Sequence, residues 1–256
     1  MFRARRQRCW SVGAAVVAAL GLMLSAAVPP TRGQGNPNPG IIPVNKQYTR
    51  LSAEWWQWAV SFPVSNSPLF DETGARGCLR EQGPGNVFFL SATFSDAPRN
   101  VSFDVPSGSR LFVILVGSEW DNAYPGPPLT VEQLYERAAA ASASVTELHA
   151  SIDGQPVQDL FSYRVRSDPF CYTVSAADKF FEFLGLADVL PPFACPAGFC
   201  VCPAVIDGFF LLLTPLPPGT HTVNTGGTVG SPPDNVTFDI TYNIRVVPRG
   251  HYQGCQ

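Results

Sequence analysis

The sequence predicts a mainly β protein, an antiparallel β-sandwich of the jelly-roll type with two or three short covering helices. Two observations lead to this fold class: apolar and polar residues alternate in several short runs, and turn-forming residues separate those runs. The chain of 256 residues contains 25 Pro and 22 Gly, which suits frequent turns better than long helices. Hydrophobic residues make up 45% of it and charged residues 14%, so it can bury a sizeable core. We expect one such domain over residues 45–256.

The first 27 residues have the pattern of a cleaved signal peptide. The segment MFRARRQR carries four arginines, and an apolar run of small residues follows it and ends in Ser-Ala-Ala before Pro29. Removal of residues 1–27 takes away those four arginines and changes the formal charge from −3 to −7. An uncleaved membrane anchor is the alternative, because the apolar run is about as long as a thin bilayer requires.

These features predict a secreted, periplasmic or cell-envelope protein with no membrane attachment after cleavage. Residues 28–44, rich in Gly, Asn and Pro and without periodicity, are expected to form a linker. A mildly acidic exported chain lacks the positive charge that attracts phosphates. We therefore expect no nucleic-acid partner and look instead to a carbohydrate or a cell-envelope ligand.

The cysteines agree with export. Six of them remain after signal cleavage, an even number that favours disulfide bonds in an oxidising compartment. They are Cys78, Cys171, Cys195, Cys200, Cys202 and Cys255. The cluster CPAGFCVC lacks the paired C-x-x-C knuckles and the nearby histidine of a zinc site, so we expect no metal and no cofactor. The spacing does not select among the pairings.

The stretch AEWWQWAVSFP, residues 53–63, carries three of the five tryptophans and predicts an amphipathic helix. One stripe of that helix is apolar and is expected to pack on the core; it contains Tyr48, Leu51, Trp55, Trp58, Ala59 and Phe62. Pro63 ends the helix. Trp56 lies at the margin of the stripe, where a half-exposed ring can contact a ligand.

Strand-like runs follow at 86–95, 100–105 and 110–117, and the turn residues between them predict a meander. Thr130 and Gln133 have the spacing of a capping box, which predicts a helix over 131–144.

A further strand is expected at 146–152, before a tight turn at Asp153-Gly154. The rest of the chain predicts a strand near 161–167, a short helix at 178–190 and three more strands at 209–214, 220–225 and 236–246. The last of these alternates most regularly.

Several of these segments together resemble a family of exported bacterial proteins of unassigned function. They are AEWWQWAVSFPVSNSPLFDETGARG, IDGQPV, DGFFLLLTPLPPGTHTV and FDITYNIRVV. Members share a W-x-W helix, an NPLxD-x-TG segment and a late L-x-PG-x-H turn. The resemblance covers most of the chain after the signal peptide and implies export but no activity. Phe103 stands where members have a cysteine, which leaves the partner of Cys78 open.

The common motifs of hydrolases, zinc proteases and nucleotide-binding proteins are absent from the sequence, so we assign no catalytic residue. Glu119 and Asp121, two positions apart in GSEWDN, face the same way on an extended segment and can meet a sugar or a hard cation. The competing interpretation is a solvated turn. His221, in PPGTHTV, is either a ligand at the rim of the sandwich or a residue that fixes the turn.

Two classes of function remain. The first is a secreted non-catalytic module that binds a carbohydrate, an envelope component or a protein partner, with Trp56, Glu119, Asp121 and His221 as candidate binding residues. The second is a secreted hydrolase or lyase that uses Glu119, Asp121 or His221. A groove in which these three side chains converge would favour the second class.

Overall fold

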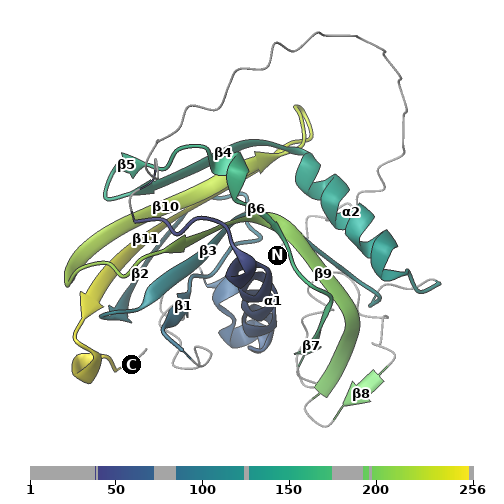
Figure 1. Ribbon diagram of the computed structural model, residues 1–256, viewed down its shortest axis with the longest axis horizontal. Helices are drawn as coiled ribbons and strands as arrows, with labels where there is room; N and C mark the ends of the chain where they lie inside the picture. The colour runs from purple at the N-terminus through teal and green to yellow at the C-terminus, as the bar shows by residue number, and fades with distance from the viewer. Residues whose placement is uncertain are drawn as a thin grey trace, which may run out of the picture. The chain divides into compact units, whose positions relative to one another are not determined.

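Two β-sheets and two α-helices make up the described part of the chain, drawn in Figure 1 from a computed structural model. The described residues are 38, 40–71, 85–123, 127–174, 193–195 and 198–253. All of them belong to one of two units of the chain, Asn36–Gln256. The expected signal peptide at 1–27 and the expected helix at 178–190 lie outside the described residues.

The first sheet, sheet A, is built around the 16-residue strand β9. Its strand order is β1-β3-β9-β6, and β7 and β8 also pair with β9. The strands are β1 (Val87–Phe89), β3 (Arg110–Asp121), β6 (Arg164–Arg166), β7 (Phe170–Val174), β8 (Phe193–Cys195) and β9 (Gly198–Leu213). Because β9 pairs with four of the others, it positions the residues that β3 and β7 carry.

The second sheet, sheet B, has the strand order β2-β11-β10-β4-β5. Its strands are β2 (Arg99–Pro106), β4 (Val145–Ile152), β5 (Gln155–Pro156), β10 (Gly219–Val229) and β11 (Val236–Val247). The period of two in β11 is confirmed, because Ile240, Tyr242 and Ile244 are buried and the residues between them are not. Apart from Val205, the buried hydrophobic residues described in the two sheets join one core.

Both sheets are mixed, which corrects the expectation of purely antiparallel pairing. Strand β1 runs parallel to β3, and β2 runs parallel to β11. The predicted meander is wrong because consecutive strands alternate between sheets: β1 and β3 belong to sheet A, whereas β2 belongs to sheet B. The turn after β2 therefore connects two sheets instead of closing a hairpin.

Helix α1 (Lys46–Val60) confirms the predicted tryptophan helix. Asn45 caps its first turn by accepting a hydrogen bond from the backbone N–H of Gln47. All six residues of the predicted stripe are buried: Tyr48, Leu51, Trp55, Trp58, Ala59 and Phe62. The Trp55 indole N–H donates to the Leu90 carbonyl over 2.8 Å, which ties the helix to the segment after β1.

Helix α2 (Val131–Ala143) also forms as predicted, with both hydrogen bonds of the Thr130–Gln133 capping box present. It packs Leu134 against Val205 of β9 and is contacted by Trp120 of β3. Since neighbouring residues of a strand face opposite ways, Trp120 and Glu119 point to opposite faces of sheet A. Helix α2 therefore covers one face, and the face of Glu119 turns toward α1. Neither described helix is long and apolar enough to cross a membrane.

Residues 28–44 were expected to form a linker, but its last residues form hydrogen bonds with sheet A. Ile41 forms an isolated antiparallel bridge with Leu213, and the Ile42 N–H donates to the Leu212 carbonyl over 2.8 Å. The Tyr48 hydroxyl donates to the Ile42 carbonyl and accepts from the Leu212 N–H. These contacts fix where α1 begins.

One disulfide, Cys171–Cys202, joins β7 to β9. Cys200 is disulfide-bonded as well. Disulfide bonding is thus confirmed for these three of the six predicted cysteines. Cys78 and Cys255, and the side chain of Cys195, lie outside the described residues.

Candidate functional site

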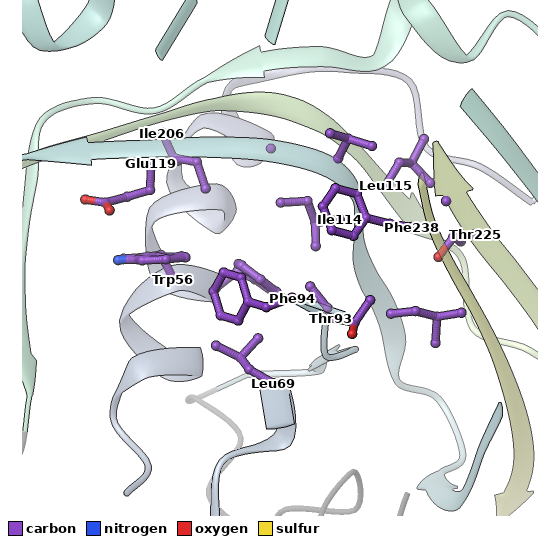
Figure 2. A pocket seen from close by; sticks show the side chains of 16 residues that line it. Trp56, Leu69, Thr93, Phe94, Ile114, Leu115, Glu119, Ile206, Thr225 and Phe238 are labelled. Carbon is purple, nitrogen blue, oxygen red and sulfur yellow. The ribbon is translucent and has the colours of Figure 1, made fainter. Parts of the chain in front are cut away.

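A cavity of about 90 Å³ lies where α1, sheet A and sheet B meet (Figure 2). Most of its lining is apolar, including Leu69, Phe94, Ile114, Ile206 and Ile240. Phe94 is 43% exposed, so the cavity reaches the surface beside this ring. This volume is several times what a single buried water needs, which is of the order of 10 to 15 Å³. The cavity can therefore hold a ring or a short chain.

Trp56 of α1 is one of the residues that line the cavity. It follows the buried Trp55 on α1 and is itself half-buried. Its indole Nε1 is shielded from solvent and has no hydrogen-bond partner among the described residues. A buried N–H without an acceptor is destabilising by about 1 to 3 kcal/mol. Trp56 therefore lines the cavity and carries a donor that is unsatisfied among the described residues.

Glu119 lines the same cavity. It lies near the end of β3, opposite Ile206 of β9, and its Oε1 is shielded from solvent and has no partner among the described residues. Figure 2 shows the Glu119 carboxyl and the Trp56 indole nitrogen at one end of the cavity. Phe238 and Thr225 lie toward the other end. Two residues with polar groups thus lie at one end of a mostly apolar cavity, whose lining also includes Thr93 and Thr225.

Asp121 is buried behind Glu119, with 6% of its surface exposed. Its Oδ1 accepts from the Ala123 N–H over 2.7 Å, and its Oδ2 accepts from the Tyr172 hydroxyl over 2.5 Å. The bond to Ala123 closes a local turn, as the turn interpretation expected, but the carboxylate is buried and not solvated. Asp121 does not line the cavity.

Burial raises the pKa of Glu119 well above its usual range, and Asp121 adds to the shift by charge repulsion and by a hydrogen bond to the protonated acid. Its surroundings therefore favour the neutral, protonated form of the Glu119 carboxyl group. A neutral acid held in an apolar cavity can bind a ligand by hydrogen bonds without the cost of a buried charge.

His221 lies elsewhere, on β10. Its Nδ1 is 2.7 Å from Asp153 Oδ2 and its Nε2 is 2.9 Å from the Pro217 carbonyl oxygen. Both ring nitrogens are thus engaged in fixing the turn around Pro217. His221 does not line the cavity, so the three residues of the hydrolase hypothesis do not converge there.

Of the four candidate binding residues, the structure brings Trp56 and Glu119 together at the cavity, with Asp121 directly behind. Sequence reasoning missed Tyr172, which holds Asp121 and packs on Trp56. Nothing in the local pattern around Tyr172 indicated this role, because the contact depends on β7 pairing with β9. The described residues contain no group of three or more side chains that could hold a metal ion.

Comparisons with known proteins add little. No protein-family model matches the chain, and no curated protein matches it. Among solved structures, the solution structure of amebosin is similar with a TM-score of 0.18 and 6% sequence identity, over 58% of this chain and 96% of amebosin. A likeness this weak supports no conclusion about fold or function.

Proposed function

We propose that this protein is an exported, non-catalytic module that binds a small amphiphilic envelope component in the cavity between α1 and β3. One observation carries the proposal: a mostly apolar cavity of about 90 Å³ is lined by Trp56 and Glu119, two of the residues that the sequence singled out as candidates for binding. Such a site has a body of apolar contacts and a small number of polar atoms that orient the ligand.

The lining of the cavity favours one of the ligand classes that the sequence left open. A carbohydrate presents several hydroxyls and needs a matching set of polar side chains, whereas the cavity lining is mostly apolar. A protein partner requires a broad surface, and this site is a small cavity of about 90 Å³. An amphiphile with an apolar ring or short chain and one polar group matches both the lining and the volume.

Export is part of the proposal. Its support is the Cys171–Cys202 disulfide, which is consistent with an oxidising compartment. The signal peptide and the resemblance to exported bacterial proteins remain predictions from the sequence. The jelly-roll form of the sandwich is likewise proposed, and its support is the single core that the two sheets share.

A secreted hydrolase or lyase remains the second candidate, and one observation favours it. The raised pKa of Glu119, due to burial and to Asp121, is a property of general acids. The engagement of His221 with Asp153 and Pro217 weighs against a mechanism that needs all three residues.

Binding in the cavity is tested with cyclohexane and cyclohexanol as probes, followed by methyl NMR of Ile114 and Ile206. We expect saturable shifts of both residues. Ala92→Leu adds bulk to the cavity wall and should weaken the binding of both probes at least several-fold. Ala140→Leu, on the exposed side of α2, makes the same change away from the cavity and should not affect binding. If neither probe shifts these methyl groups, the proposed function is wrong.

A further inference from the structure

We propose that the Phe94 ring is the gate of the cavity between α1 and β3, and that this ring turns aside before an apolar ligand enters or leaves. The inference rests on the proposed binding function and goes beyond it, because it assigns the route of entry and a residue that controls its rate. Phe70, which stacks on Phe94, holds the gate closed.

Phe94 lies between the cavity and the solvent. It belongs to the lining of the cavity and is 43% exposed. Among the described residues, it is the one large apolar side chain of this lining that is exposed. Figure 2 shows its ring beside Leu69 and Trp56. A side chain with one surface on a cavity and another in solvent is part of the wall that separates them.

The wall is closed at the end where Trp56 and Glu119 lie. Trp56 Nε1 and Glu119 Oε1 are both shielded from solvent. Gly117, near the same end, is exposed but has no side chain. Ile114 fills the space above it, because a methyl group on Gly117 would lie 2.5 Å from Ile114 Cδ1. A ligand therefore meets packed side chains at this end.

Sheet B closes the opposite side of the cavity. Its lining residues Thr225, Gly226 and Ile240 are buried. The outer surface of Gly226 is covered by His149, since a methyl group on Gly226 would lie 2.6 Å from His149 Cε1. Phe94 therefore stands at the part of the wall that faces the solvent most directly.

The Phe94 ring has the freedom that a gate requires. It lies between β1 and β2, outside any helix or strand. The Ala92 carbonyl accepts from Arg99 Nη1 over 2.9 Å, which fixes the chain two positions earlier. The hydrogen bonds described for residues 93–97 lie within that segment. The ring can therefore change rotamer without breaking a hydrogen bond of either sheet.

Phe70 supplies the contact that keeps the ring in place. The two rings stack with centroids 5.7 Å apart and planes inclined at 26°. Phe70 is half-buried and is not one of the residues that line the cavity. Its stacking opposes the opening of the gate without contact to a ligand inside. A change at Phe70 therefore alters the gate and leaves the wall of the cavity intact.

The test measures the rates at which the full chain binds cyclohexane, from NMR line shapes of the Ile114 and Ile206 methyl groups. Phe94→Ala opens the route, so the association and dissociation rate constants should both rise by at least about tenfold. A residue that only formed part of the wall would change the dissociation rate constant alone, because it would affect the stability of the complex and not access to it.

Phe70→Leu keeps an apolar side chain and removes the stacking. The association rate constant should rise about two- to tenfold, which corresponds to the loss of one aromatic pair, and the affinity should stay nearly the same. Phe161→Ala is the matched control for Phe94→Ala. Phe161 is 51% exposed and packs edge to face on Phe209, but it does not line the cavity. This control should leave both rate constants unchanged.

The outcomes separate the two proposals. An unchanged association rate constant in Phe94→Ala or in Phe70→Leu would overturn the gate and leave the binding function in place. Equal acceleration in Phe161→Ala would overturn it too, because the effect would then be a general loosening of the fold. If Phe94→Ala does not fold, Phe70→Leu decides the case. If cyclohexane shifts neither methyl group in the parent or in any variant, both proposals fail.

Discussion

Trp56 and Tyr172 pack edge to face, with ring centroids 6.2 Å apart and ring planes inclined at 86°. The pair joins α1 to β7, and the adjacent Gln57 donates from Nε2 to the Cys171 carbonyl over 2.7 Å. Tyr172 in turn holds Asp121 at the end of β3. The polar end of the cavity therefore depends on contacts between three elements that are distant in the sequence.

The three tryptophans of α1 should differ in their contribution to stability. Trp55 and Trp58 are 1% and 6% exposed, so Trp55→Ala and Trp58→Ala should each lower the free energy of unfolding by roughly 3 to 5 kcal/mol. Trp56→Ala should cost less, because its ring is half-buried beside a cavity. Urea unfolding of the three variants measures the difference. An equal loss in Trp56→Ala would mean that Trp56 is a core residue and not a wall of a ligand site.

Glu119 should make stability fall as pH rises. Its folded-state pKa lies well above the ordinary value of 4.5, so above that pH the folded protein retains a proton that the unfolded chain has lost. The free energy of unfolding should therefore decrease from pH 4.5 upward until the folded group ionises. Glu119→Gln removes this loss and should be more stable than the parent at pH 8 but not at pH 4. Urea unfolding at both pH values tests this, and a parallel loss in the variant would assign the effect to another group.

Tyr172→Phe should destabilise the protein by about 1 to 3 kcal/mol, because a buried carboxylate loses a hydrogen-bond donor. The aromatic contact with Trp56 is retained in this variant. Tyr135→Phe is a suitable control, since it removes a donor to the Ser167 carbonyl at a half-buried position. It should cost about 1 kcal/mol or less. Thermal unfolding compares the two, and equal losses would show that Asp121 does not depend on Tyr172.

The pair His221–Asp153 should stabilise the protein most at low pH. Burial lowers the pKa of His221, but hydrogen bonds to Asp153 and the Pro217 carbonyl and the charge of Asp153 outweigh it, so the pKa is raised. The stabilisation is fully present below the ordinary value of 6.5 and is lost as pH rises through the folded-state pKa. Asp153→Asn should therefore cost more stability at pH 5.5 than at pH 8.5. NMR titration of His221 should also show its pKa falling in the variant.

Reduction of Cys171–Cys202 should destabilise the protein by roughly 2 to 4 kcal/mol on the loop-closure estimate. The bond joins β7, which carries Tyr172, to β9, so the affinity for cyclohexanol should fall as well. The double variant Cys171→Ser, Cys202→Ser avoids the effect of reductant on the other cysteines. Thiol labelling of the denatured, non-reduced parent should leave both residues unmodified, and labelling of either would contradict the assignment.

Local patterns were sufficient for the elements that carry their own signals. The capping box at Thr130 and Gln133 predicted α2, and the apolar stripe with Pro63 predicted α1. The regular alternation of β11 and the Asp153-Gly154 turn were read correctly for the same reason: each depends on residues within a few positions of one another.

The bounds of three predicted strands differ from the structure, because the local sequence patterns there are ambiguous. Strand β9 was expected only at 209–214, because Pro203 and the cysteine cluster interrupt the apolar pattern. The run 86–95 forms a strand only at Val87–Phe89. The segment 161–167 begins as a short 3-10 helix, Leu160–Tyr163, and becomes strand only at β6.

The sequence by itself determined which face of α1 is buried, that Trp56 lies at the margin of that face, and that Glu119 and Asp121 point the same way. These properties follow from the periods of a helix and a strand, which the chain carries locally. Only the tertiary structure decided that β2 joins a different sheet from β1 and β3, that Tyr172 meets Asp121, and that His221 lies away from the cavity. Those relationships depend on pairing between strands far apart in the chain, where the alternation of side chains is compatible with many partners and packing selects one.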